Sequence, residues 1–167
     1  MNITIIEATS PEHIGTATEL FREYAASLEV DLCFQGFEEE LSSLPGKYAP
    51  PAGGLFLALS GDGPLGCVAL RPLPEPRTAE LKRLYVRPRA RGQQLGLSLV
   101  RRALARAVET GCRKVRLDTL PSMGTAQRLY RSLGFHETVP YTFNPVPGVT
   151  YMELDLPETP PKASPPA

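Results

Sequence analysis

The stretch Val86–Leu99 (VRPRARGQQLGLSL) combines the residue types that bind a phosphate group. Pro88 ends an apolar run, and residues 91–96 (RGQQLG) then lead into a region with helical apolar spacing. Glycines in a turn that opens a helix let backbone N–H groups point at an anion, and the helix dipole adds about half a positive charge there. The turn therefore predicts a site for a phosphate-bearing ligand, with an ordinary strand-to-helix turn as the alternative.

Basic residues are concentrated around this turn, although the chain is neutral overall, with 18 Lys and Arg against 18 Asp and Glu. Residues 82–116 hold eleven bases and one acid, a net charge of +10, and three of the bases, Arg87, Arg89 and Arg91, stand beside the turn. A local positive field favours a small anionic ligand over nucleic acid, which needs basic residues over an extended surface. Solvated arginines on an exposed helix face are the alternative. No Gly-Lys-Ser/Thr follows and no GxGxxG is present, which excludes a Walker A loop and a dinucleotide fingerprint.

The other polar residues do not indicate metal or hydrolase chemistry. The three cysteines show no CxxC or Cys/His spacing, and His13 and His136 lie far apart in the sequence, so no metal site is predicted. We expect the cysteines to be reduced packing residues. The acidic run Glu38–Glu40 is expected either on a solvated helix face or as a cluster that attracts a cationic amine.

The elements that must position the turn alternate between strands and helices. A helix follows Pro11, and the other expected helices are Leu95–Thr110 and Thr125–Leu133, each followed by a glycine suited to a left-handed cap. The expected strands lie around Ile3 and Ile5 and at Leu55–Ser60, Leu65–Arg71, Glu80–Val86, Arg113–Thr119 and Val149–Leu156. This order predicts an α/β fold with a mixed sheet, in which the unit 80–119 supplies a parallel pair and a right-handed crossover.

One domain is expected over residues 1–156, followed by a proline-rich tail at 157–167 (PETPPKASPPA). The tail has almost nothing apolar to bury, which predicts a disordered or polyproline II extension. The longest apolar runs are far shorter than the roughly 18 residues that cross a bilayer, and the start lacks the basic residues of a signal peptide. We therefore expect a cytoplasmic protein, as a monomer or homodimer.

Two segments together resemble the acetyl-CoA signature of the GNAT superfamily of N-acetyltransferases. They are Val86-Arg87-Pro88 with Arg91-Gly92-x-x-x-Gly96, and the later Ala126-x-x-Leu129-Tyr130-x-x-x-Gly134-Phe135. The resemblance implies a splayed central sheet flanked by helices, with acyl-CoA in the splay, its pyrophosphate on the turn 91–96 and its pantetheine beside the strand that ends at Val86. The implied cofactor-binding residues are Leu84, Tyr85, Val86, Arg91, Gly92, Gln93, Gln94, Leu95, Gly96 and Leu97.

The resemblance also implies catalytic roles. Tyr130 stands at the family position of the general acid that protonates the CoA sulfur, with a core aromatic as the alternative. Glu80 is a candidate general base, directly or through water, although a solvated or salt-bridged glutamate is an alternative. Glu80 opens an alternating strand pattern that continues through Lys82, Leu84 and Val86. A backbone N–H near Val86 is the implied oxyanion donor.

Two positions depart from the family pattern. Gln94 replaces the middle glycine of Q/R-x-x-G-x-G/A, and we expect CoA binding to be retained if residue 94 is already helical, because the backbone N–H is the donor. Met123 stands three residues before Ala126, where the family often has Asn, which removes one side-chain contact to the pantetheine region.

These features predict an N-acetyltransferase that moves acetyl from acetyl-CoA to a primary amine of a small molecule or peptide. No metal, nucleic acid or membrane is expected as a partner. The alternatives are an acyl-CoA sensor without turnover, a nucleic-acid-binding module that uses the +10 segment, and an interaction protein that acts through the proline-rich tail.

Overall fold

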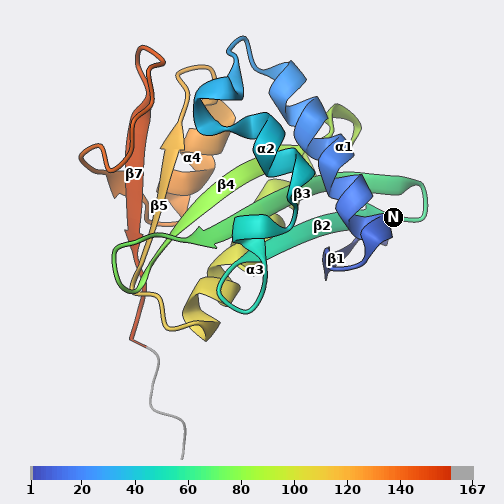
Figure 1. Cartoon of the computed structure of the whole chain (residues 1–167), viewed down its shortest axis with the longest axis horizontal. Helices are drawn as coiled ribbons and strands as arrows, with labels where there is room; N and C mark the ends of the chain where they lie inside the picture. The colour runs from blue at the N-terminus through green and yellow to red at the C-terminus, as the bar shows by residue number, and fades with distance from the viewer. Residues whose placement is uncertain (1, 159–167) are drawn as a thin grey trace, which may run out of the picture.

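A mixed seven-stranded sheet runs through the computed structural model, which describes residues 2–158 (Figure 1). The strand order is β1-β2-β3-β4-β5-β7-β6. The strands are β1 (Thr4–Glu7), β2 (Gly54–Ser60), β3 (Gly63–Pro72), β4 (Thr78–Val86), β5 (Lys114–Thr119), β6 (His136–Glu137) and β7 (Thr150–Asp155). The helices are α1 (Pro11–Ser27), α2 (Phe37–Ser42), α3 (Leu95–Glu109) and α4 (Gly124–Ser132), with 3-10 turns at Leu32–Gln35, Gly46–Tyr48 and Pro88–Ala90.

The expected mixed α/β fold is confirmed, and each predicted strand and helix is present with its ends shifted by one or two residues. The short helix α2 and the two-residue strand β6 are additions to the predicted order. Most of the predicted tail, residues 159–167, lies outside the described residues, so the division into domain and tail stays a prediction.

The sheet carries a separate apolar core on each face. Helices α1 and α2 cover one face, where buried Phe21 packs with Leu57 and Cys67. Helices α3 and α4 cover the other, where Leu99 packs with Val68. Cys67 and Val68 are neighbours on β3 and belong to opposite cores, because successive strand residues point to opposite faces. We call these the α1/α2 face and the α3/α4 face.

Strands β4 and β5 form a parallel pair that soon separates. Only three residues of β4, Thr78, Ala79 and Glu80, pair with β5, although β4 continues to Val86. Figure 1 shows the two strands close together where they begin and apart where they end. Helix α3 connects them, as the predicted crossover requires. The predicted splay of the sheet therefore lies between the second half of β4 and the end of β5.

A β-bulge at Arg83 changes the side-chain pattern of β4. Arg83 has φ of 60°, and the register with β3 shifts at this point. Before the bulge, Glu80 and Lys82 point to the α1/α2 face, where they contact Arg71 and the 3-10 turn at Gln35. After it, Leu84 and Val86 pack against the α3/α4 core. The prediction that Glu80 alternates in phase with Leu84 and Val86 is therefore wrong, because the bulge inserts one extra residue.

The two helices that flank the splay end where the sequence predicts. Gly111 follows α3 with φ of 83°, and Gly134 follows α4 with φ of 102°, so both adopt the left-handed cap conformation. The longest helix, α1, has 17 residues. Within residues 2–158, no helix combines the length and hydropathy needed to cross a bilayer.

Candidate functional site

The turn before α3 leaves its backbone amides open to a ligand. The first turn of α3 is closed by the amide of Ser98, which donates to the carbonyl of Gln94 at 3.2 Å. The amides of Leu95, Gly96 and Leu97 precede this bond, and the first N–H groups of a helix have no partner within it. Gly92 has φ of 83° and so reverses the chain just before the helix. Amides in this arrangement at a helix N-terminus can bind an anion, and the predicted phosphate site at the turn stays a prediction.

Gln94 does not have the helical backbone on which the expectation of retained CoA binding depended. It is the N-cap of α3 and has φ of 58° and ψ of 24°, in the left-handed region. Residues other than glycine adopt this region at a cost in conformational energy. This explains why the family pattern has glycine at this position. The N–H group of residue 94 is retained with glutamine, whereas the backbone is strained.

Of the three arginines beside the turn, only Arg87 has carboxylate partners among residues 2–158. Arg87 forms salt bridges with Glu19 and Glu23 of α1, at 2.8 and 2.7 Å. Arg89 donates to carbonyl groups of the β2–β3 hairpin. Arg91 donates through Nε to the carbonyl of Val86 at 3.1 Å and has no carboxylate partner among residues 2–158. Arg89 and Arg91 therefore both remain available to pair with a phosphate at the turn.

A cavity opens where β4 and β5 separate, and we call it the splay cavity. Its walls come from both strands and from the helices on either side. Tyr24, Leu28, Leu32, Phe34, Gln35, Leu81, Lys82, Arg83, Leu84, Asp118, Leu120, Met123, Ala126, Tyr130 and Asn144 line it. The predicted site residues Leu84 and Tyr130 thus meet in one cavity. Gly96, in the first turn of α3, lies between α4 and β4. A Cβ at this position would be 3.5 Å from the side chain of Leu129 on α4 and 4.0 Å from that of Val86 on β4, so the turn lies next to the splay.

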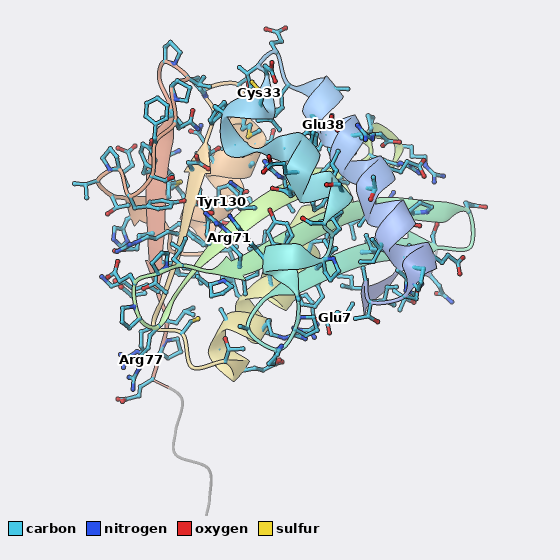
Figure 2. All side chains as sticks on the ribbon, in the orientation of Figure 1. Glu7, Cys33, Glu38, Arg71, Arg77 and Tyr130 are labelled. Atoms are coloured by element: carbon cyan, nitrogen blue, oxygen red, sulfur yellow. The ribbon has the colours of Figure 1, made fainter. Side chains whose placement is uncertain are left out.

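Tyr130 is a core aromatic that also lines the splay cavity, and its role as the general acid stays a prediction. Its ring is buried in the α3/α4 core and lies 5.6 Å from the ring of Phe135, centroid to centroid. The same residue lines the splay cavity, and Figure 2 shows it in the interior of the molecule. Burial raises the pKa of Tyr130 well above its ordinary value. Its hydroxyl therefore carries its proton at neutral pH, and it makes no hydrogen bond to any group of residues 2–158.

A second cavity adjoins the first, and we call it the polar cavity. Phe34, Gln35, Glu40, Lys47, Tyr48, Arg71, Glu80, Lys82, Asp118, Thr142 and Phe143 line it. Four of these residues also line the splay cavity, namely Phe34, Gln35, Lys82 and Asp118. These shared residues lie at the boundary between the two cavities, and we call them the junction.

Glu80 lies fully buried at the wall of the polar cavity. Its Oε1 accepts a hydrogen bond from Nε of Arg71 at 2.7 Å, and Lys82 Nζ is 3.8 Å from the same oxygen. Its Oε2 accepts from the hydroxyl of Tyr141 at 2.5 Å. The structure therefore shows the salt-bridged glutamate considered above. Its role as a general base stays a prediction.

The acidic run on α2 is only partly solvated. Glu40 accepts two hydrogen bonds from Arg83, from Nε at 2.8 Å and from Nη2 at 3.0 Å. Glu38 pairs at the surface with Arg22. The pair between Glu40 and Arg83 holds the bulged residue of β4 in place, so the charge of Glu40 is already neutralised and is not available to a cationic amine.

Three residues of the candidate site were not predicted from the sequence. Asp118 and Lys82 line both cavities, and Tyr141 donates to Glu80. A signal for Asp118 was present in β5, where charged Lys114, Arg116 and Asp118 alternate with apolar positions and share one face. Asp118 accepts a hydrogen bond from the side chain of Asn144 at 3.0 Å. Tyr141 had no comparable signal, because its contact with Glu80 joins residues far apart in the chain.

Comparison with known proteins agrees with this arrangement. Residues 17–135 match the Acetyltransferase (GNAT) family model. An uncharacterised N-acetyltransferase of Schizosaccharomyces pombe is 40% identical over 156 residues, which cover 93% of this chain and 96% of that protein.

Two solved structures share the fold. A GNAT-family acetyltransferase from Staphylococcus aureus Mu50 has a TM-score of 0.78 at 20% identity, covering 93% of this chain and 100% of that one. The PaiA N-acetyltransferase of Thermoplasma acidophilum, in complex with coenzyme A, has a TM-score of 0.72 at 20% identity, with 93% and 100% covered. GNAT acetyltransferases use acetyl-CoA and act on amine acceptors. On the family match and the close relative, this chain belongs to the GNAT family and is an acetyl-CoA-dependent N-acetyltransferase, as its sequence predicted.

Proposed function

We propose that this N-acetyltransferase holds acetyl-CoA with its pyrophosphate on the turn 91–97 and its pantetheine along β4 in the splay cavity. The acetyl group would then pass to a small primary amine in the polar cavity. The observation that carries this proposal is the separation of β4 from β5 after Glu80, which opens the splay cavity beside Tyr130. The open amides at the start of α3 support the phosphate site.

The edge of β4 supports the proposed place of the pantetheine. Beyond Glu80, no strand among residues 2–158 pairs with β4 on its β5 side, so backbone groups along 82–86 face the splay. Strand edges with open N–H and C=O groups bind extended ligands through hydrogen bonds. The contributing residues in the proposal are Leu84, Tyr85, Val86, Arg91, Gly92, Gln93, Gln94, Leu95, Gly96 and Leu97. Tyr85 takes part through its backbone alone, because its side chain packs in the α1/α2 core.

The proposed chemistry is a balanced acyl transfer. The neutral amine nitrogen forms a bond to the acetyl carbonyl carbon, the carbon–sulfur bond breaks, and the amine loses a proton while the sulfur gains one. Tyr130 gives its proton to the departing sulfur, and a β4 amide near Val86 donates to the carbonyl oxygen. Glu80 accepts the amine proton, through water or by exchanging its bond from Tyr141.

We also propose that the protein acts in the cytoplasm, as a monomer or homodimer. The support for the location is the state of the cysteines, since Cys33, Cys67 and Cys112 are all free thiols and two of them are buried. Free thiols are typical of reducing compartments. Size-exclusion chromatography with light scattering would measure the oligomeric state.

Calorimetric titration with ligands that differ only in their phosphates tests the site. We expect CoA to bind the wild type and Arg91→Gln to weaken it about tenfold, because a hydrogen bond to a charged group contributes roughly 1.5–3 kcal/mol. Acetylpantetheine lacks the phosphates, so its affinity should not depend on Arg91. Arg101→Gln is the matched control, at an exposed position of α3. No heat at hundreds of micromolar CoA with a folded sample would contradict the proposal.

A further inference from the structure

The polar cavity has three carboxylates, and one of them has no cationic partner at hydrogen-bond distance in the described part of the chain. Two of its carboxylates have cationic partners at hydrogen-bond distance: Glu40 is held by Arg83, and Glu80 by Arg71. Asp118 has a neutral partner, the side chain of Asn144, and forms no salt bridge among residues 2–158. One negative charge at the junction of the two cavities is therefore left without a cation.

Lys82 is the cation at the same junction, and its nearest carboxylate lies beyond hydrogen-bond distance. Its side chain is 11% exposed, and its Nζ donates to a neutral group, Oε1 of Gln35, at 3.2 Å. The nearest carboxylate oxygen is Oε1 of Glu80 at 3.8 Å, and that oxygen already accepts from Arg71 at 2.7 Å. Burial lowers the pKa of Lys82, against the opposing effects of Glu80 and, more weakly, Asp118, so a further anion in contact with the ammonium would stabilise its charged form.

Asp118 and Lys82 do not satisfy each other. Both line both cavities, yet no nitrogen–oxygen distance of 4.0 Å or less joins them. The junction therefore presents one negative and one positive group with a gap between them. A ligand that carries an ammonium and a carboxylate on neighbouring atoms would pair with both.

We infer that the acetyl acceptor is an amino acid, whose ammonium pairs with Asp118 and whose carboxylate pairs with Lys82. The inference rests on the function proposed for the two cavities. Pairing at Asp118 places the reacting nitrogen at the wall shared with the splay cavity, where Tyr130 also lies. The ammonium first gives one proton to water, the neutral amine then attacks the acetyl carbon, and Glu80 accepts the second proton as described above.

The other classes of amine are matched less well. A polyamine would bring a second positive charge with no second unpaired carboxylate to receive it, because Glu40 and Glu80 are already held by Arg83 and Arg71. The N-terminus of a peptide has an amide in place of the carboxylate, so Lys82 would be left without an anion.

Wild-type protein and matched acceptors test the inference without any variant. Thiol release from acetyl-CoA is measured with the twenty amino acids, and then with the amide and the decarboxylated amine of each active one, for example L-phenylalanine, L-phenylalaninamide and phenethylamine. We expect kcat/KM for the amino acid to exceed that for both analogues about tenfold or more, since an ion pair in a desolvated site contributes at least about 1.5 kcal/mol.

Removing the charge of Lys82 then tests whether this residue contacts the carboxylate of the acceptor. Lys82→Met keeps the length of the side chain and should lower kcat/KM for the amino acid about tenfold or more, with little change for the amide. Lys114→Met is the matched control on β5, outside both cavities, and should leave both substrates unaffected. Asp118→Asn should lower the activity with amino acid and amide together, because both carry the ammonium. Thermal melting and CoA titration verify that each variant is folded.

The outcomes separate this inference from the proposed function. Equal rates with amino acids and their decarboxylated amines, or transfer to no amino acid by a protein that binds CoA, would overturn the inference alone. Failure of the wild type to bind CoA would overturn the proposed function first. A Lys82→Met variant that keeps its preference for the carboxylate would also overturn the inference.

Discussion

Tyr130 is a residue whose ring and hydroxyl have separate tasks in the proposed mechanism. The ring belongs to the α3/α4 core, while the residue also forms part of the wall of the splay cavity. A hydroxyl placed at a buried cavity keeps its proton, because burial raises the pKa of Tyr130. This is the state in which a general acid can act on a departing sulfur.

Removing that hydroxyl tests the assignment. We expect Tyr130→Phe to lower kcat by roughly 10²–10⁴-fold, which is the usual contribution of a general acid. CoA affinity and melting temperature should change little, because the hydroxyl has no hydrogen-bond partner among residues 2–158 and phenylalanine keeps the ring. Steady-state kinetics, calorimetric titration and thermal melting measure the three quantities. An unaltered kcat with chemistry shown to be rate-limiting would remove Tyr130 from the mechanism.

Gln94 gives a second prediction at the residue scale. Its left-handed backbone costs about 1 kcal/mol or more for a residue with a Cβ. We expect Gln94→Gly to raise the melting temperature by roughly 2–4 °C per kcal/mol gained and to retain CoA binding through the same N–H. Gln93→Gly is the matched control, since residue 93 is not among those with positive φ and glycine there gains nothing. A lower melting temperature for Gln94→Gly than for Gln93→Gly would contradict this account.

At the scale of elements, a pair of glutamates attaches α1 to the end of β4. Arg87, the residue directly after β4, forms salt bridges with Glu19 and Glu23. The hydrogen bond from Arg87 holds the pKa of Glu23 below its ordinary value of 4.5, against the opposing effect of burial. A lowered pKa means that the ionised form is the one the fold stabilises.

The attachment of α1 should therefore depend on pH in a definite direction. Because the folded pKa of Glu23 is depressed, its contribution is present above the unfolded pKa and is lost as pH falls below 4.5 through the folded value. We expect Glu23→Gln to be less stable than the wild type at pH 7 and the difference to shrink toward zero in acid. Urea unfolding at several pH values measures this. Glu38→Gln, at an exposed pair, should show little difference at any pH.

Elements with local signals were predictable, and those fixed by distant contacts were not. Helix α3 and its phosphate turn follow from apolar spacing and glycines within a dozen residues, and Tyr130 follows from a compact motif. The bulge at Arg83 depends on Glu40, which is 43 positions earlier, so the alternation of β4 could not reveal it. The same holds for Tyr141 on Glu80, 61 positions away. The wall of the polar cavity therefore depends on contacts between residues far apart in the sequence. The turn before α3 and the position of Tyr130 depend on patterns within a short segment.

At the scale of the whole molecule, the residues that line both cavities end at Asn144, well before the predicted tail. Leu156 is buried against the α3/α4 core, and Glu158 reaches only a surface pair with Arg113 at 3.7 Å. We therefore expect a protein truncated after Glu158 to keep the melting temperature, CoA affinity and kcat of the full chain. A large loss in any of these would show that residues 159–167 contribute to the domain.

The sheet has two parts that share few contacts across the splay. Three residue pairs connect β4 to β5, and beyond them the space between the strands is the splay cavity. A ligand that contacts β4, the start of α3 and α4 at once would add contacts between the two parts that the free protein lacks. Binding to the folded protein alone stabilises it in proportion to the logarithm of the ligand concentration.

CoA should therefore raise the thermal stability of the whole domain. At a free concentration of one hundred times Kd, we expect a gain of about 2.7 kcal/mol, which corresponds to roughly 5–11 °C for a domain of this size. At the same free concentration, Arg91→Gln with about tenfold weaker binding should gain about 1.4 kcal/mol, close to half that shift. Melting followed by circular dichroism at increasing CoA measures both. Equal shifts for the two proteins would mean that CoA is held without Arg91, and the absence of any shift would mean that CoA does not bind the folded protein.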